Sequence, residues 1–242
     1  MSGSIIAALI LAAVAALFFL FGFLVRKKRL VFIDTPTLTA AQLAEATFRA
    51  GEVVAEVSGR TGAGPAGPLS GPYSEIPCVW YETTVVRHYR KTETDSKGNA
   101  RLVNATETVE TNESHQVLTI KDATGRVLFE PVKGSVDGAS QTHERYEQAG
   151  RRDRRYGHRQ GTTGFTYRER ALKPDVAVFA IGRVRAQDST LVMGKPENGP
   201  FMVSTRSEAE HLKSGWFWQR FWFGGSLTAV AVAMGLIVYD LL

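Results

Sequence analysis

The chain has 242 residues, of which 44% are hydrophobic, and it carries 29 lysines and arginines against 24 aspartates and glutamates. A chain of this length could bury a sizeable core, but its longest apolar runs lie near its two ends. These features exclude a freely soluble enzyme and a collagen-like or disordered chain. The single cysteine excludes a disulfide-stapled secreted domain and a cysteine-based zinc site.

Two uncharged apolar runs flank the chain. Residues 5–25 and 221–239 contain no Lys, Arg, Asp or Glu, and as helices they would measure roughly 31 Å and 29 Å. The hydrocarbon core of a bilayer is about 30 Å thick, so both runs are predicted to be transmembrane helices. The first run has no basic segment before it and is longer than the apolar core of a signal peptide, which indicates an uncleaved anchor.

Basic residues flank the two predicted spans only on their inner sides. The first span is followed by a cluster that consists of Arg26, Lys27, Lys28 and Arg29. The second span is preceded by Arg206, Lys213 and Arg220, whereas neither outer tail has a Lys or an Arg. The positive-inside rule therefore predicts a two-pass protein with both termini outside and the intervening domain in the cytoplasm. The 26–29 cluster is expected to set this topology and to contact lipid headgroups, in the plasma membrane if the chain is bacterial.

Small residues recur at every fourth position of each predicted span. They are Ala8, Ala12 and Ala16 in the first span, and Gly225, Ala229 and Ala233 in the second. Such faces let helix backbones approach closely, so the helices could pair within one chain or join two copies into a homo-oligomer. Neither span has an ionisable residue inside it, which argues against a transporter or a channel.

The chain between the spans is predicted to form one β-rich domain over residues 30–213. It begins with a short helix at 39–46, which Thr37 or Thr39 could cap and Gly51 ends. A strand follows at 52–57. The segment 59–72 contains glycines at positions 62, 64 and 67 in the spacing of a dinucleotide-binding loop. Prolines interrupt it and a strand follows it, so a plain connecting loop is expected instead.

The strongest strand signal covers residues 76–91, which are rich in β-branched and aromatic side chains. A polar turn at 92–100, with a hairpin tip at 97–99, leads to a polar strand or loop at 101–113. Residues 131–164 are polar and suggest no element. Further short strands are expected at 115–120, 126–130, 165–172, 176–184, 191–193 and 201–203. This pattern predicts a mainly β fold, a small barrel-like or sandwich domain with short flanking helices.

Cys78, the single cysteine of the chain, is a candidate nucleophile. His88 lies about 33 Å further along the same expected strand, so the two side chains could not meet directly. Cys78 also follows a proline inside an apolar strand, which favours a buried, inert thiol. No close pair of carboxylates and no nucleophile elbow is present in the sequence, and neither a cofactor nor a metal site is expected.

A dense basic cluster interrupts the polar stretch. It consists of Arg151, Arg152, Arg154, Arg155 and Arg159. These side chains could bind the phosphates of anionic lipids or, less expectedly, of nucleic acid. The simpler interpretation is a solvated loop, and the residues alone leave both open.

Four short motifs follow one another along the domain. They are Pro77-Cys-Val-Trp-Tyr81, Leu118-Thr-Ile-Lys-Asp-Ala-Thr-Gly125, Phe165-x-Tyr-x-Glu-x-x-Leu-x-Pro174 with Val178-x-x-x-Gly182, and Gly199-Pro-Phe-x-Val-Ser204. Together with the flanking spans, they make the chain resemble the GIDE family. Its domain is also called BAM, "beside a membrane", and occurs in two-span mitochondrial RING E3 ubiquitin ligases and their bacterial relatives. The resemblance covers residues 35–213.

In those ligases a RING finger follows the second span, and it needs about eight Cys or His ligands for two zinc ions. This sequence has one cysteine and ends at Leu242, so the RING is expected to be absent. The resemblance then implies a membrane-anchored binding or scaffolding protein without catalytic residues, with a protein partner or a small ligand at the β-rich domain. Two alternatives remain: a ligase-like or hydrolytic enzyme, and an anionic lipid or nucleic-acid binder that uses the 151–159 arginines.

Overall fold

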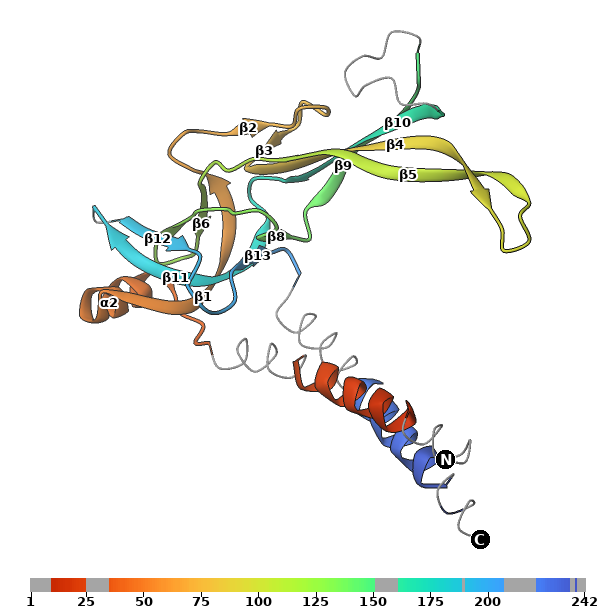
Figure 1. The fold of residues 1–242 in the computed structure, drawn as a ribbon. Helices are drawn as coiled ribbons and strands as arrows, with labels where there is room; N and C mark the ends of the chain where they lie inside the picture. Colours follow the sequence, from red (N-terminus) through yellow and green to blue (C-terminus); the bar gives the residue numbers. More distant parts are fainter. Residues whose placement is uncertain are drawn as a thin grey trace. The chain divides into compact units, whose positions relative to one another are not determined.

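The structure is a computed structural model that describes residues 10–24, 35–150, 161–188, 190–206, 221–235 and 238. The chain forms two compact units (Figure 1). One unit comprises Met1–Pro36 with Arg206–Leu242, and the other comprises Thr37–Thr205. The second unit is mainly β, as the sequence predicts.

The β-rich unit begins with helix α2 (Ala40–Ala50) and continues with strands β1 to β13. The first seven strands are β1 (Glu52–Ala63), β2 (Leu69–Ser70), β3 (Pro77–Cys78), β4 (Trp80–Thr94), β5 (Ala100–Glu113), β6 (Leu118–Lys121) and β7 (Arg126–Phe129). The others are β8 (Val136–Asp137), β9 (Ser140–Gln148), β10 (Thr162–Leu172), β11 (Ala177–Gln187), β12 (Thr190–Gly194) and β13 (Met202–Ser204).

Five strands close into a barrel in the order β1-β6-β7-β12-β11, and β11 pairs back with β1. The neighbours are antiparallel except β7 and β12, which run parallel. Strands β13 and β8 extend the same sheet from β11 (Figure 1). Of the two arrangements that the sequence allows, the barrel is the one that forms.

Apolar side chains fill the barrel interior because alternate residues of each strand point inward. Phe129 and Met193 are fully buried, and Val57 is 1% exposed. The ring of Phe129 stacks on that of Phe201 with their centroids 4.8 Å apart. Burial of this apolar surface is the main stabilising contribution to this part of the fold.

Helix α2 forms where the sequence predicts a helix and runs one turn further. The Thr39 side chain accepts a hydrogen bond from the backbone N–H of Gln42, whose own side chain accepts one from the backbone N–H of Thr39. This capping box starts the helix. Gly51, with φ of +79°, ends it, because a positive φ is readily available only to glycine. Leu43 anchors the helix on the barrel and is fully buried.

A second, four-stranded sheet has the order β5-β4-β10-β9, and β2 pairs with β3 beside it. The strand predicted at 76–91 is divided at Val79, because Cys78 before it pairs with Leu69 on β2 whereas Trp80 after it pairs with Leu172 on β10. Beyond this break, β4 and β5 form a long hairpin (Figure 1). Asp95 accepts hydrogen bonds from the backbone of Lys97 and Asn99, which forms the expected tip.

Two sequence-based expectations fail within the β-rich unit. The polar stretch 131–164 contains β8, β9 and the start of β10, because strand β9 lies at the edge of the sheet and needs few apolar residues. The glycine-rich segment continues strand β1 to Ala63. A side chain at Gly64 would overlap the carbonyl of Val117, so this glycine permits a close strand approach rather than phosphate binding.

In the other unit, residues 10–24 and 221–235 are helical and lie side by side. The rings of Phe18 and Trp222 are 4.9 Å apart. Ala15 and Ala233 are buried, whereas Ala12 and Ala16 are exposed and Ala8 lies outside the described residues. None of the helices in the described ranges combines the length and the apolar character that crossing a bilayer requires. Residues 5–9, 25, 236–237 and 239 of the predicted spans lie outside those ranges.

Candidate functional site

The four-stranded sheet has one exposed polar face. A shallow hollow of about 380 Å³ lies on it, and we call its lining residues the charged face: Glu82, Thr84, Gln141, Glu144, Arg168 and Arg170. Strand register places Arg170 opposite Glu82 on β4 and Arg168 opposite Glu144 on β9. Because directly opposite residues of antiparallel strands share a face, the register alone brings these charges together.

Each arginine of the charged face bonds to one carboxylate. Arg168 donates from Nε and Nη2 to Oε1 of Glu144, at 3.1 Å and 3.0 Å. Arg170 donates from Nε to Oε2 of Glu82 at 2.8 Å. Gln141 donates to Glu144 at 2.7 Å. The hydrogen bond from Gln141, together with Arg168, lowers the pKa of Glu144 below its usual range, so this carboxylate is charged at neutral pH.

The arginines of the charged face remain accessible, whereas their partners Glu144 and Glu82 are 42% and 17% exposed. The side chains of Arg168 and Arg170 are 50% and 49% exposed. Exposed pairs of this kind contribute little to stability, because water and salt screen them. A guanidinium can instead exchange one carboxylate for another, or bind a peptide carbonyl. The arrangement is therefore suited to polar recognition.

Behind this face, the sheet contains a buried carboxylate. Glu169 lies between the two arginines on β10, points to the opposite side and has no exposed surface. It accepts hydrogen bonds from the backbone N–H groups of Tyr73 and Ser74 at 2.7 Å and 3.2 Å. The hydroxyls of Ser74 and Thr142 also donate to it, each at 2.5 Å. Four donors from two distant segments therefore converge on one side chain.

Burial by itself would raise the pKa of Glu169, but the hydrogen bonds from Ser74, Thr142 and the Tyr73 backbone outweigh it and lower the pKa below its ordinary value. The carboxylate is therefore charged and fully engaged. A Cβ at Gly71 would come within 2.5 Å of Glu169 Oε1, so the loop approaches this closely only with glycine there. These contacts give Glu169 a structural role: it fastens the β2–β3 loop to the sheet.

A second buried polar group, Arg87, lies on the same side of the sheet. It is 4% exposed and donates to Glu107 at 2.9 Å and to the Thr162 hydroxyl at 2.7 Å. Its guanidinium also lies 4.5 Å from the centroid of the Tyr89 ring. Glu169 and Arg87 show that this side of the sheet is held by directional polar contacts.

Cys78 lies in β3 and has no exposed surface. Burial, with a further contribution from the negative charge of Glu169, raises the pKa of the Cys78 thiol. The thiolate is the nucleophilic form of cysteine, so a buried, protonated thiol is unsuited to catalysis.

His88 does not serve as a base for the Cys78 thiol. Its Nε2 lies 2.7 Å from the Thr166 hydroxyl, and its ring contacts that of Tyr146. Among the described residues, no three His, Cys, Asp or Glu side chains gather in a way that could hold a metal ion.

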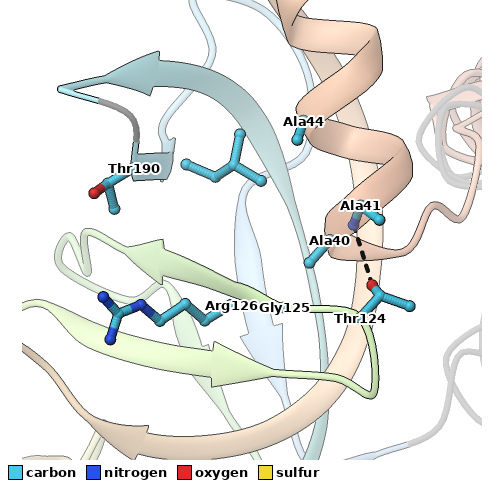
Figure 2. A pocket seen from close by; sticks show the side chains of 8 residues that line it. Ala40, Ala41, Ala44, Thr124, Gly125, Arg126 and Thr190 are labelled. Atoms are coloured by element: carbon cyan, nitrogen blue, oxygen red, sulfur yellow. Dashed lines mark hydrogen bonds between the residues drawn. The ribbon is translucent and has the colours of Figure 1, made fainter.

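A second hollow, of about 240 Å³, lies between helix α2 and the β6–β7 turn (Figure 2). Its lining residues are Ala40, Ala41, Ala44, Thr124, Gly125, Arg126, Thr190 and Leu191. The first helical N–H groups are already occupied. Ala40 donates to Asp122 at 2.7 Å, and Ala41 donates to the Thr124 hydroxyl at 3.1 Å.

Asp122 also accepts hydrogen bonds from the backbone of Thr124 and Gly125. Burial would raise its pKa, but the bonds from Ala40 and the turn lower it, so the helix N-terminus is capped by a charged carboxylate. This hollow is a packing feature rather than an anion site.

The two basic clusters that the sequence singles out lie outside the described residues. These are the arginines at 151, 152, 154, 155 and 159, and the cluster at 26–29. Their expected contacts with phosphates and headgroups stay predictions. The charged face, by contrast, was missed by sequence reasoning. The sequence contained one signal for it: Arg168 and Arg170 flank Glu169 in one strand, so the two arginines are expected on the same face of the sheet.

A family model, GIDE, described as "E3 Ubiquitin ligase", matches residues 86–238. The match covers more than half of the chain and includes most of the hairpin, β9 and β10. It contains three of the four motifs that carry the resemblance, and the first motif, at 77–81, lies before it. The chain belongs to the GIDE family. No curated protein and no solved structure matches it.

Proposed function

We propose that this GIDE-family chain is a membrane-anchored binding or scaffolding protein whose charged face recognises a protein partner. The observation that carries the proposal is the exposure of Arg168 and Arg170 in a hollow crossed by three strands. The thiol of Cys78 and the carboxylate of Glu169 are fully buried, and Glu169 accepts hydrogen bonds from the fold itself, so neither group is available to a ligand. A shallow, polar hollow with charges of both signs suits a polypeptide surface better than a small apolar ligand.

Site-specific photocrosslinking in intact cells tests this recognition. A photoreactive amino acid replaces Thr84, which lies inside the hollow, and captured proteins are quantified by mass spectrometry. A specific partner should be captured at Thr84, and replacing both Arg168 and Arg170 by Ala should abolish its capture. The matched control is Arg60→Ala, which removes a different exposed ion pair, with Asp175. Equal capture by the double variant and the control would refute recognition through the charged face.

The proposed anchor consists of transmembrane helices at 5–25 and 221–239, with both termini outside. Its support is the length of the two apolar runs and the basic residues on their inner flanks. A membrane-impermeant maleimide tests the topology through single cysteines. In intact cells, a Ser2→Cys variant should be labelled and a Lys97→Cys variant, at the exposed hairpin tip, should be labelled only after permeabilisation. Labelling of Lys97→Cys in intact cells would invert the proposed orientation.

A further inference from the structure

Strand β5 forms one edge of the four-stranded sheet, and no other described strand pairs with its outer side. Its pairing with β4 is regular from Ala100 to Thr108, and a bulge at Val109 ends that stretch. We call residues 100–108 the β5 edge. Natural proteins block long edges with charged side chains, especially lysine, with proline or with a bulge; the β5 edge contains neither Lys nor Pro, and its two charges, Arg101 and Glu107, have opposite signs. Its backbone is therefore open to another strand.

The backbone groups that face outward can be identified from one hydrogen bond. Arg90 on β4 donates its N–H to the carbonyl of Gly161 at 2.8 Å and so points away from β5. In an antiparallel pair, opposite residues either exchange both backbone bonds or point away from each other. Asn104, which lies opposite Arg90, therefore points toward the outer side, as do Leu102 and Thr106.

We propose that two copies of the chain pair through their β5 edges, antiparallel, around a two-fold axis at Asn104. Position 104 is the midpoint of residues 100–108, so this register uses the whole regular stretch. Asn104 then exchanges backbone hydrogen bonds with Asn104 of the second copy, and Leu102 exchanges them with Thr106. The four-stranded sheets of the two copies become one continuous sheet, joined by an isologous contact.

The side chains of the β5 edge are self-complementary in this register. Arg101 lies directly opposite Glu107 of the second copy, and symmetry repeats the pair. Both belong to pairs without backbone bonds, where Cα atoms are about 4.5 Å apart and side chains are closest. Glu107 already accepts a hydrogen bond from Arg87 through Oε1, and a carboxylate has the capacity for a second arginine.

Neighbouring registers lack this match. A two-fold axis at Val103 places Arg101 opposite Ala105, and an axis at Ala105 places it opposite Val109 in the bulge. Leu102, which is 71% exposed in the single chain, is partly covered by Thr106 of the second copy when the axis is at Asn104. Charge pairing and the position of the bulge therefore select the same register. This pairing goes beyond the proposed function and holds whether or not the charged face binds a partner.

Disulfide crosslinking of the full chain in nanodiscs tests the register. An Asn104→Cys variant should form a crosslinked dimer under mild oxidation, because the two Cα atoms would lie about 5.5 Å apart, within disulfide range. The control is Ala100→Cys, whose two copies would be offset by about 27 Å and should remain uncrosslinked. The native Cys78 is fully buried and serves as the background in the unmodified chain.

A charge reversal provides an independent measurement. Arg101→Glu should weaken dimerisation at least about tenfold by light scattering, because both symmetric pairs become repulsive. Lys195→Glu is the matched control, an equal charge change at an exposed loop residue outside the β5 edge. A dimer that forms without crosslinking at position 104, a chain that stays monomeric, or equal effects of the two reversals would each overturn the proposal.

Discussion

The barrel and the four-stranded sheet are stabilised in different ways. Inside the barrel, Phe129, Met193 and Val57 belong to one buried apolar cluster, and apolar burial holds the strands together. One side of the four-stranded sheet instead encloses Glu169 and Arg87, each surrounded by hydrogen-bond partners. Apolar packing tolerates small adjustments, whereas a buried charge requires all its partners in place. The two regions should therefore respond differently to substitution and to pH.

The largest effect is expected in the barrel. Phe129→Ala removes a fully buried ring that stacks on Phe201, and it should lower the free energy of unfolding by about 4 kcal/mol, through lost burial and a residual cavity. Denaturant unfolding of the full chain in detergent, followed by tryptophan fluorescence, measures the change. A loss below about 1 kcal/mol would mean that the barrel interior is loosely packed.

Glu169→Gln should cost about 2 kcal/mol, because an amide keeps the size of the side chain but presents N–H groups to donors. The loss should be local. Amide hydrogen exchange should accelerate at Tyr73 and Ser74, while the barrel amide of Val57 keeps its protection. Glu144→Gln, on the exposed face, is the matched control and should leave exchange at these loop amides unchanged.

Acidification should loosen the four-stranded sheet before the barrel. The pKa of Glu169 is lowered in the fold below its ordinary value of 4.5, so the unfolded chain binds this proton more readily. Its stabilising contribution is thus complete above pH 4.5 and disappears as the pH falls through the lowered value. Exchange at Tyr73 measured between neutral and acidic pH should show this loss, and the Glu169→Gln variant should lack it. An identical pH response in both proteins would contradict this assignment.

A smaller effect is expected where the barrel meets its helix. Asp122→Ala removes the carboxylate that accepts the Ala40 N–H and should cost about 1 kcal/mol, as the loss of a helix cap does. Faster amide exchange in the first turn of α2, without a change in the four-stranded sheet, would confirm that the cap acts locally. Glu197→Ala, at an exposed loop position of the same unit, serves as the control.

The smallest effect is expected on the charged face. Arg170→Ala breaks an ion pair between the half-exposed Arg170 and Glu82, whose side chain is 17% exposed, and should change the unfolding free energy by less than about 1 kcal/mol. The same thermal or chemical unfolding experiment measures it. A cost as large as that of Glu169→Gln would show that this face stabilises the sheet instead of being available for recognition.

The sequence predicted the mainly β class, the helix before the barrel and the hairpin tip at residues 97–99, because local patterns determine these features. It left strand β9 out, since an exposed edge strand such as Ser140–Gln148 carries no apolar alternation. The charged face depends on register between β4, β9 and β10, which lie far apart in the chain. The partners of Glu169 were unpredictable for the same reason: Tyr73 lies 96 residues away from it.

The cap on helix α2 also has a consequence for biosynthesis. Asp122 lies 82 residues beyond the Ala40 N–H that it accepts. At about 5–20 residues per second, the ribosome adds this carboxylate roughly 4 to 16 seconds after it has added Ala40. During that interval the apolar side of α2, including Leu43, has no barrel to bury it. Helix α2 is therefore among the first elements of the β-rich unit to be synthesised and among the last to reach its final contacts.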